Sequence, residues 1–248
     1  MRVFSNPNTP IPEVHLLSNN RYHVMATHAG GGYSRWRDLA VTRWREDTTR
    51  DHWGSFCYLR DTVSGQYWST AYQPTLTLPK PYEAIFSGGR AEFRRRDNGI
   101  DTHTEIVVSP EDDIELRRVH ITNHTRTVRT LDVTSYAEVV MASADADAIH
   151  PAFNNLFVQT EILRDQRVIL CTRRPRSELE HPPWMFHIMA VHDVAFEPAS
   201  YETDRSRFIG RGRSVANPQS LDFKQLSGSE GSVLDPIVAV RHTITLEP

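Results

Sequence analysis

The chain has 248 residues, of which 39% are hydrophobic and 24% charged, and its formal net charge is −3. This composition is typical of a folded globular protein and excludes wholesale disorder. The small net charge excludes a global field that would attract nucleic acid or an acidic membrane. No apolar stretch reaches the about 20 residues that span a bilayer, and the first residues lack the apolar core of a signal peptide. We therefore expect a soluble, intracellular protein.

The first distinctive segment in chain order is residues 28–47, with the sequence HAGGGYSRWRDLAVTRWRED. No lysine and no helix-period pattern follow the three glycines, which excludes a P-loop or a dinucleotide fingerprint, and Ser34 does not stand between glycines as in a nucleophile elbow. Aromatic rings interleaved with guanidinium groups suit a sugar, which has an apolar C–H face and a rim of hydroxyls. The residues alone also allow the opposite reading, in which the tryptophans belong to the core and the arginines pair with nearby carboxylates.

Period-two alternation of apolar and polar residues dominates the middle of the chain and predicts β-strands. The alternating runs are residues 83–87, 90–96, 100–108, 113–122 and 129–140. Short turn formers, among them Gly88-Gly89 and Asn98-Gly99, join these runs and are strong hairpin signals. The pattern predicts one continuous antiparallel meander from Glu83 to Val140, with the last strand half-buried. A change of apolar phase predicts a β-bulge near Arg117.

Further strands are predicted on both sides of this meander. A turn at 63–66 joins two runs into a hairpin, and more runs lie at 154–163, 167–174, 184–191 and 234–248. The best helix candidate is the short segment 218–226. A dozen or more strands with almost no helix predict an all-β fold, either a sandwich or a barrel. Cys57 and Cys171 lie in β-like runs far apart in sequence, so we expect buried free thiols.

Two other kinds of site receive no support from the sequence. The twelve histidines show no zinc-ribbon spacing and no HExxH motif, and His120 and His124 straddle a strand end and a turn, so we predict no metal site. The arginine runs at 94–96 and 173–176 offer a basic patch, but alternate residues of a strand point to opposite faces. We therefore predict no nucleic-acid binding.

Several long segments together resemble one protein family. They are residues 12–47, 53–61, 64–75, 82–97, 109–123, 150–162 and 232–244. They are similar to the N-terminal β domain of the cellobiose and chitobiose phosphorylase family, and most similar to the phosphorylase-related C-terminal region of bacterial cyclic β-1,2-glucan synthases. The sequence departs from the family pattern at Asn20, where glycine is expected in a turn, and at His28, where asparagine is expected.

The resemblance implies a large two-layer antiparallel sandwich, a supersandwich similar to galactose mutarotase. It implies one such domain over residues 13–248 after a lead-in of residues 1–12, and a helical (α/α)6 barrel elsewhere that holds the general acid of an inverting phosphorylase. Because nothing in this chain matches that acid, we expect the isolated chain to be inactive, to need no cofactor, and to continue into a helix-rich region beyond Pro248. The implied role is to support the barrel, to mediate dimerisation, and to assist β-glucan synthesis on the cytoplasmic side of an inner-membrane synthase.

With this resemblance, the reading of the glycine segment shifts toward function. We predict an exposed loop over residues 30–38 that projects toward a sugar site. The candidate carbohydrate-binding residues are Gly31, Gly32, Tyr33, Ser34, Arg35, Trp36, Arg37 and Asp38. The alternative is a stand-alone lectin-like or mutarotase-like sandwich, and a mutarotase would require an acid and a base paired in one cleft.

Overall fold

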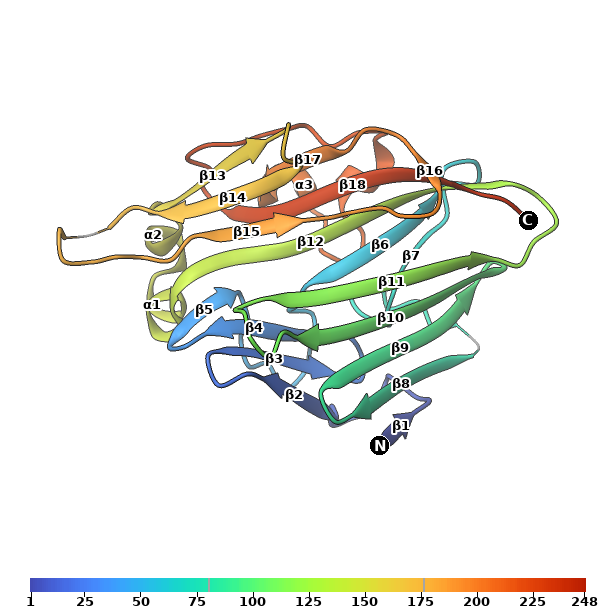
Figure 1. Ribbon diagram of the computed structural model, residues 1–248, viewed down its shortest axis with the longest axis horizontal. Coiled ribbons are helices and arrows are strands. Elements are labelled where there is room, and N and C mark those ends of the chain that lie inside the picture. The colour runs from blue at the N-terminus through green and yellow to red at the C-terminus, as the bar shows by residue number, and fades with distance from the viewer. Residues whose placement is uncertain (80, 176) are drawn as a thin grey trace.

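The computed structural model describes residues 1–79, 81–175 and 177–248, and antiparallel strands make up most of them (Figure 1). A five-stranded sheet has the order β1-β8-β9-β10-β11. Its strands are β1 (Arg2–Phe4), β8 (Tyr82–Ser87), β9 (Arg90–Asp97), β10 (Ile100–Val108) and β11 (Glu115–Asn123). The residues expected as a lead-in thus include β1, which pairs with β8.

The largest sheet has ten strands and the main order β16-β18-β12-β5-β4-β3-β2. Its strands are β2 (Val14–Ser18), β3 (Tyr22–Thr27), β4 (Gly32–Trp36), β5 (Leu39–Thr42), β6 (Phe56–Asp61), β7 (Tyr67–Ser69), β12 (Arg129–Ser143), β16 (Ala195–Phe196), β17 (Ser200–Asp204) and β18 (Pro236–Leu246). A third sheet contains β13 (Val158–Leu163), β14 (Val168–Arg173) and β15 (Met185–Ile188). The predicted all-β antiparallel sandwich is confirmed.

Helices are short and few in the described ranges. They are α1 (Ala144–Ile149), α2 (Pro151–Asn155), α3 (Arg205–Ile209) and the 3-10 turn η1 (Gln219–Asp222). The segment 218–226 thus contains one 3-10 turn where the sequence pattern suggested a helix. Within the described part of the chain, no helix is long and apolar enough to cross a membrane.

The predicted meander is correct for its first four strands and wrong for the fifth. β8 to β11 follow one another as neighbours, but β12 leaves this sheet and pairs with β18 on one edge and with β6 and β5 on the other. The predicted bulge near Arg117 is also wrong, because β10 and β11 pair in one unbroken register from Ile100–Asn123 to Val108–Glu115. In this register Leu116 is exposed, and Arg117 points inward and donates to the Ser55 carbonyl at 2.9 Å.

β12 is covered on both faces, although its alternation predicted a half-buried strand. Val139 packs with Ile169 of the three-stranded sheet on one face, whereas Tyr136 packs with Phe208 of α3 on the other. In Figure 1 this strand runs through the middle of the molecule, between the five-stranded sheet and the strands β13 to β15. Because the α3 side also covers it, the polar positions Asp132, Thr134 and Glu138 of β12 are buried.

The space between the sheets is filled by an apolar core. Leu17 and Val24 pack against Phe86 and Phe93 of the five-stranded sheet, and Trp68 packs near Leu131. A fully buried side chain of this size contributes roughly 1.5–3 kcal/mol through removal from water. Cys57 and Cys171 are free thiols, as expected, but only Cys171 is fully buried and Cys57 is half-buried. Burial raises the pKa of each thiol to about 12, which disfavours the reactive thiolate.

Candidate functional site

The glycine run serves close packing inside the domain. Residues 28–31 form the tight connection from β3 into β4, and the Gly32 amide donates to the Trp53 carbonyl at 2.8 Å. A Cβ at Gly31 would overlap the carboxylate of Asp51, and one at Gly32 would overlap the carbonyl of Met25. Gly32 also has a φ of 150°, which L residues rarely adopt. The glycines therefore allow other parts of this chain, Asp51 and Met25, to pack closely against the backbone.

The prediction of an exposed loop over residues 30–38 is wrong. Gly32–Trp36 is strand β4, which pairs with β3 on one side and β5 on the other, and only Arg37 and Asp38 form the exposed turn. Arg37 adopts the left-handed φ of 51° that this two-residue turn requires. The alternation of a strand then separates the predicted site residues onto two faces.

One group of them faces the five-stranded sheet. Ser34 donates to the Glu115 carboxylate of β11, and Trp36 Nε1 donates to Asp113 Oδ2 at 2.6 Å. The Arg37 guanidinium stacks on the Trp36 ring at 4.6 Å from its centroid. Trp36 is half-buried and connects the two sheets. The fold therefore holds Trp36 at the junction of the sheets without making it part of the core. The alternative interpretation, with core tryptophans and arginines paired to nearby carboxylates, is not confirmed here, because Arg35 and Arg37 stack on the rings of Tyr33 and Trp36.

The other group faces away from the five-stranded sheet. The Tyr33 ring meets the Trp44 ring edge-on at a centroid distance of 5.7 Å, and the Arg35 guanidinium lies 4.7 Å from the Tyr33 centroid. We call Tyr33, Arg35 and Trp44 the outer aromatic face. A second arginine–aromatic pair continues along the chain, since the Arg45 guanidinium lies 5.8 Å from the Trp53 centroid. Tyr33, Arg35 and Trp44 are each half-buried, so their outer surfaces remain accessible.

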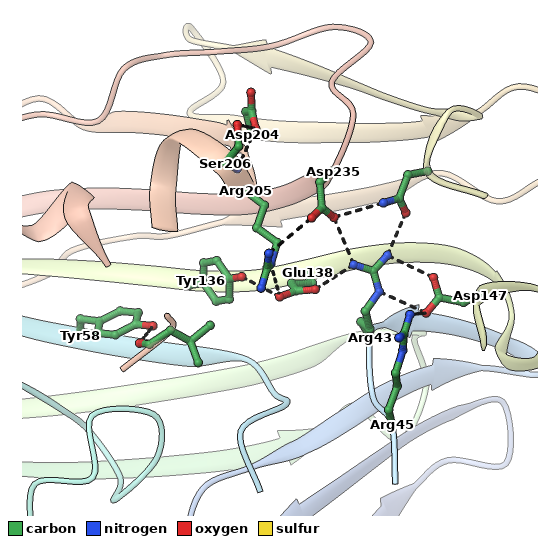
Figure 2. Close-up of polar contacts among 12 residues, drawn as sticks. Arg43, Arg45, Tyr58, Tyr136, Glu138, Asp147, Asp204, Arg205, Ser206 and Asp235 are labelled. Atoms are coloured by element: carbon green, nitrogen blue, oxygen red, sulfur yellow. Dashed lines mark hydrogen bonds and ion pairs between the residues drawn. The ribbon is translucent and has the colours of Figure 1, made fainter. Parts of the chain in front are cut away.

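A buried charge cluster adjoins Trp44 in the chain and is centred on the preceding residue, Arg43 (Figure 2). Arg43 emerges at the end of β5 and binds carboxylates from three other parts of the chain. Its bonds run to Glu138 at 2.8 Å, Asp147 at 3.1 Å and Asp235 at 3.1 Å. Arg205 of α3 adds a second guanidinium, at 2.6 Å from Glu138. The cluster thus joins β5, β12, α1, α3 and the segment before β18.

The electrostatics of this cluster indicate a structural junction. Burial by itself would lower the pKa of Arg43. The hydrogen bond to Asp147 and the charge of Glu138 outweigh this effect, so the net pKa is raised and the guanidinium stays charged. Burial and the charge of Glu138 raise the pKa of Asp235. Glu138, Asp147 and Asp235 are all paired with a guanidinium, which indicates that they hold these segments of the chain together. The sequence pattern gave no warning of this cluster, because its members are far apart in the chain.

Asp51 is a second feature that the sequence did not predict. Its carboxyl accepts a hydrogen bond from the Thr27 hydroxyl at 2.5 Å and fills the space beside Gly31. Burial raises the pKa of Asp51 to about 6, and the Thr27 hydrogen bond only partly offsets this effect. No salt bridge compensates its charge among the described residues. Burial therefore disfavours the charged form of Asp51 at neutral pH.

The departures from the family pattern both have structural roles. Asn20 adopts the left-handed φ of 74° that its turn requires, as expected for an asparagine in place of glycine. His28 is buried, and its ring accepts from the Glu13 amide at 3.0 Å and contacts the Thr9 hydroxyl at 2.9 Å. His28 thus fixes the N-terminal segment to β3.

The outer face of the five-stranded sheet carries a network of ion pairs. Ligand atoms of Glu92, His103 and Glu105 lie within 4.8 Å of one another. However, Arg90 and Arg94 bind Glu92, and Arg90 and Arg118 bind Glu105, so arginines already satisfy the two carboxylates.

The arginine triplet divides between the two faces of β9, as its alternation predicted. Arg94 and Arg96 are exposed, whereas Arg95 is buried and paired with Asp97 at 2.7 Å. In the second basic run, at 173–176, Arg173 is buried and binds Asn154, and Arg176 lies outside the described residues. These arginines do not form one basic patch.

The family model of the glycosyl hydrolase 94 supersandwich domain matches residues 1–248. The chain belongs to this family. The cyclic β-(1,2)-glucan synthase NdvB of Rhizobium meliloti is 38% identical over 98% of the chain, which corresponds to 9% of NdvB. The N,N'-diacetylchitobiose phosphorylase of Vibrio proteolyticus is 27% identical over 99% of the chain, and the solabiose phosphorylase of Paenibacillus borealis is 25% identical over 99%.

The chain corresponds to only part of the length of each of these relatives. It spans 9% of the length of NdvB, 30% of the chitobiose phosphorylase and 32% of the solabiose phosphorylase. The resemblance stated from the sequence is therefore confirmed at the level of the family. The greater part of each relative lies outside the matched region.

Proposed function

We propose that this chain is the non-catalytic β-sandwich module of a cyclic β-1,2-glucan synthase or related glycoside phosphorylase, and that its outer aromatic face binds the glucan. Family membership and the 38% identity to NdvB support the module assignment. The small share of each relative that the chain spans supports a catalytic barrel elsewhere in the full-length protein. In this proposal the module supports that barrel, takes part in a homodimer, and works on the cytoplasmic side of the inner membrane.

The observation that carries the glucan-binding role is the arrangement of Tyr33, Arg35 and Trp44. Two aromatic rings at 5.7 Å form a partly exposed apolar surface, and a guanidinium lies 4.7 Å from one of them. A pyranose ring presents a C–H face to such a surface, and its hydroxyls accept hydrogen bonds from the guanidinium. The neighbouring carboxylates Glu138 and Asp147 are both bound by Arg43, and Glu138 is also bound by Arg205, which fits binding without catalysis.

The proposal is tested in the full-length protein by comparing two tryptophans. Trp44→Ala should raise the KM for β-1,2-glucan by roughly 30-fold, the equivalent of a hot-spot loss of ~2 kcal/mol. Trp184→Ala is the matched control, because Trp184 is 73% exposed in a loop far along the chain. Its KM should equal that of the unmodified protein. Equal KM values for both variants and the unmodified protein would overturn the glucan-binding role.

The non-catalytic role has its own test. The isolated chain, incubated with β-1,2-glucan and phosphate, should release no glucose 1-phosphate, because protonation of the leaving oxygen requires an acid that the barrel supplies in this proposal. Release that disappears in a point variant of this chain would show that the module is catalytic.

A further inference from the structure

A groove lies between the turn joining β13 to β14 and the edge formed by β16, β17 and β18. Its volume is about 490 Å³, within the range of pockets that hold small molecules. The lining residues are Arg164, Arg167, Phe196, Pro198, Ala199, Ser200, Tyr201, Leu226, Gly228 and His242. None of these residues belongs to the outer aromatic face or to the buried charge cluster.

The walls of the groove are built by the fold. Segment 226–228 is fixed alongside β17, because the Gly228 amide donates to the Tyr201 carbonyl at 2.8 Å and the Leu226 amide donates to Ser200 Oγ at 3.1 Å. On the opposite side, the Phe196 ring stands edge-on to the buried His242 ring at a centroid distance of 5.4 Å. Phe196 remains 41% exposed and offers an apolar surface to the groove.

The charge of the groove is positive. Its lining contains two arginines and no carboxylate. Arg164 is paired with Glu230 at 3.1 Å, outside the lining, whereas the exposed Arg167 has no ion pair among the described residues. Tyr201 lines the same groove as Arg164 and Arg167. An anion that entered the groove would meet these three groups together.

We propose that this groove is a binding site for a sugar phosphate. Guanidinium groups match the oxygens of a phosphate ester with charge-assisted, often bidentate hydrogen bonds. Tyr201 adds a hydroxyl to the lining, and Phe196 and Pro198 form an apolar wall on which the C–H face of a sugar ring packs. The inference does not depend on the proposed glucan binding, because it rests on different residues and a different charge.

The experiment uses the 248-residue chain and isothermal titration with four probes: glucose 1-phosphate, glucose 6-phosphate, inorganic phosphate and glucose. At least one hexose phosphate should bind with a Kd of about 1 mM or tighter, at least about tenfold more tightly than phosphate or glucose alone. Arg167→Gln should weaken this binding by about 10- to 100-fold, the equivalent of one hydrogen bond to a charged group. Because Arg167 is exposed, this variant should fold normally.

A second arginine controls for general charge. Arg211 is also exposed and lies in the loop after α3, outside the groove. Arg211→Gln should leave hexose phosphate binding unchanged, and Phe196→Ala should reduce the advantage of the ester over inorganic phosphate. The proposal is overturned if neither ester binds up to about 10 mM, if glucose or phosphate alone binds as tightly, or if both arginine variants lose binding equally.

Discussion

Replacing Arg43 by methionine tests whether the buried charge cluster holds the domain together. The Arg43 side chain is 5% exposed. Its removal would leave the carboxylates of Glu138, Asp147 and Asp235 with Arg205 and the more exposed Arg45, which lies 3.8 Å from Asp147, as their only ion-pair partners among the described residues. Removing one partner of a buried ion pair costs about 3–5 kcal/mol, because the remaining charges lie uncompensated in a poorly polarisable interior. A domain is stable by only about 5–15 kcal/mol, so Arg43→Met should come close to unfolding this one.

The pH dependence of this cost has a definite sign. Without Arg43, the pKa of the remaining carboxyls in the folded state rises above their unfolded value, and protonation relieves their repulsion. The cost should therefore be fully present above the raised folded pKa and should shrink as the pH falls toward the unfolded pKa of about 4. Urea unfolding at pH 7 and at pH 5 measures both values.

A neighbouring arginine supplies the control for this experiment. The Arg45 side chain is 40% exposed and lies 3.8 Å from Asp147, so Arg45→Met should cost less than about 1 kcal/mol at either pH. The reasoning would be refuted by an Arg43→Met variant that loses under about 1 kcal/mol at pH 7, or by a loss that is equal at pH 7 and pH 5.

Three further predictions concern single residues. Burial raises the pKa of Asp51 to about 6, so the unmodified protein loses stability as the pH rises from about 4 through 6. Asp51→Asn should therefore be more stable than the unmodified protein by up to about 3 kcal/mol at pH 8 and equally stable near pH 4. Urea unfolding at the two pH values measures this difference. A difference in stability that is the same at pH 8 and pH 4 would contradict the prediction. Trp36→Ala should lower the Tm by roughly 6–12 °C through a loss of ~3 kcal/mol, and an unchanged Tm with weakened glucan binding would instead make Trp36 a ligand contact. Gly32→Ala should yield little folded protein, because the new Cβ would overlap a backbone carbonyl. Gly65→Ala is the control, because a Cβ there meets nothing within 4 Å, and this variant should fold at a cost of about 1 kcal/mol. Similar yields of folded protein for the two variants would argue against close packing at Gly32.

The parts of the fold that depend on local chemistry were predictable. The Gly88-Gly89 and Asn98-Gly99 turns specify their hairpins through positive φ at Gly89, Asn98 and Gly99, and both hairpins formed as predicted. The pairing of β12 was not predictable, because its alternation suits any neighbouring strand. Its pairing with β18, and not with β11, depends on contacts about 100 residues or more apart along the chain.

The candidate site shows the same limit. The period of two in a strand would have separated Tyr33 from Trp36, but the glycine run suggested a loop, and the loop hypothesis placed all eight residues together. Glycine marks a close approach without identifying what approaches, and here the neighbours were Asp51 and Met25. Likewise, Glu138 occupies a polar position of an alternating strand, and only the covering segment around α3 makes it a buried ion.

The position of β12 has a consequence for how this protein is made. One edge of β12 is completed by β6 and β5, which are synthesised before it, but the other edge waits for β18, which begins at Pro236. During translation, which adds about 5–20 residues per second, a long and largely apolar strand edge therefore stays unpaired while almost 100 further residues emerge. An unpaired edge of this kind readily joins another chain. The order of strands in the sheet therefore leaves this edge open to pairing with another chain between the synthesis of β12 and that of β18.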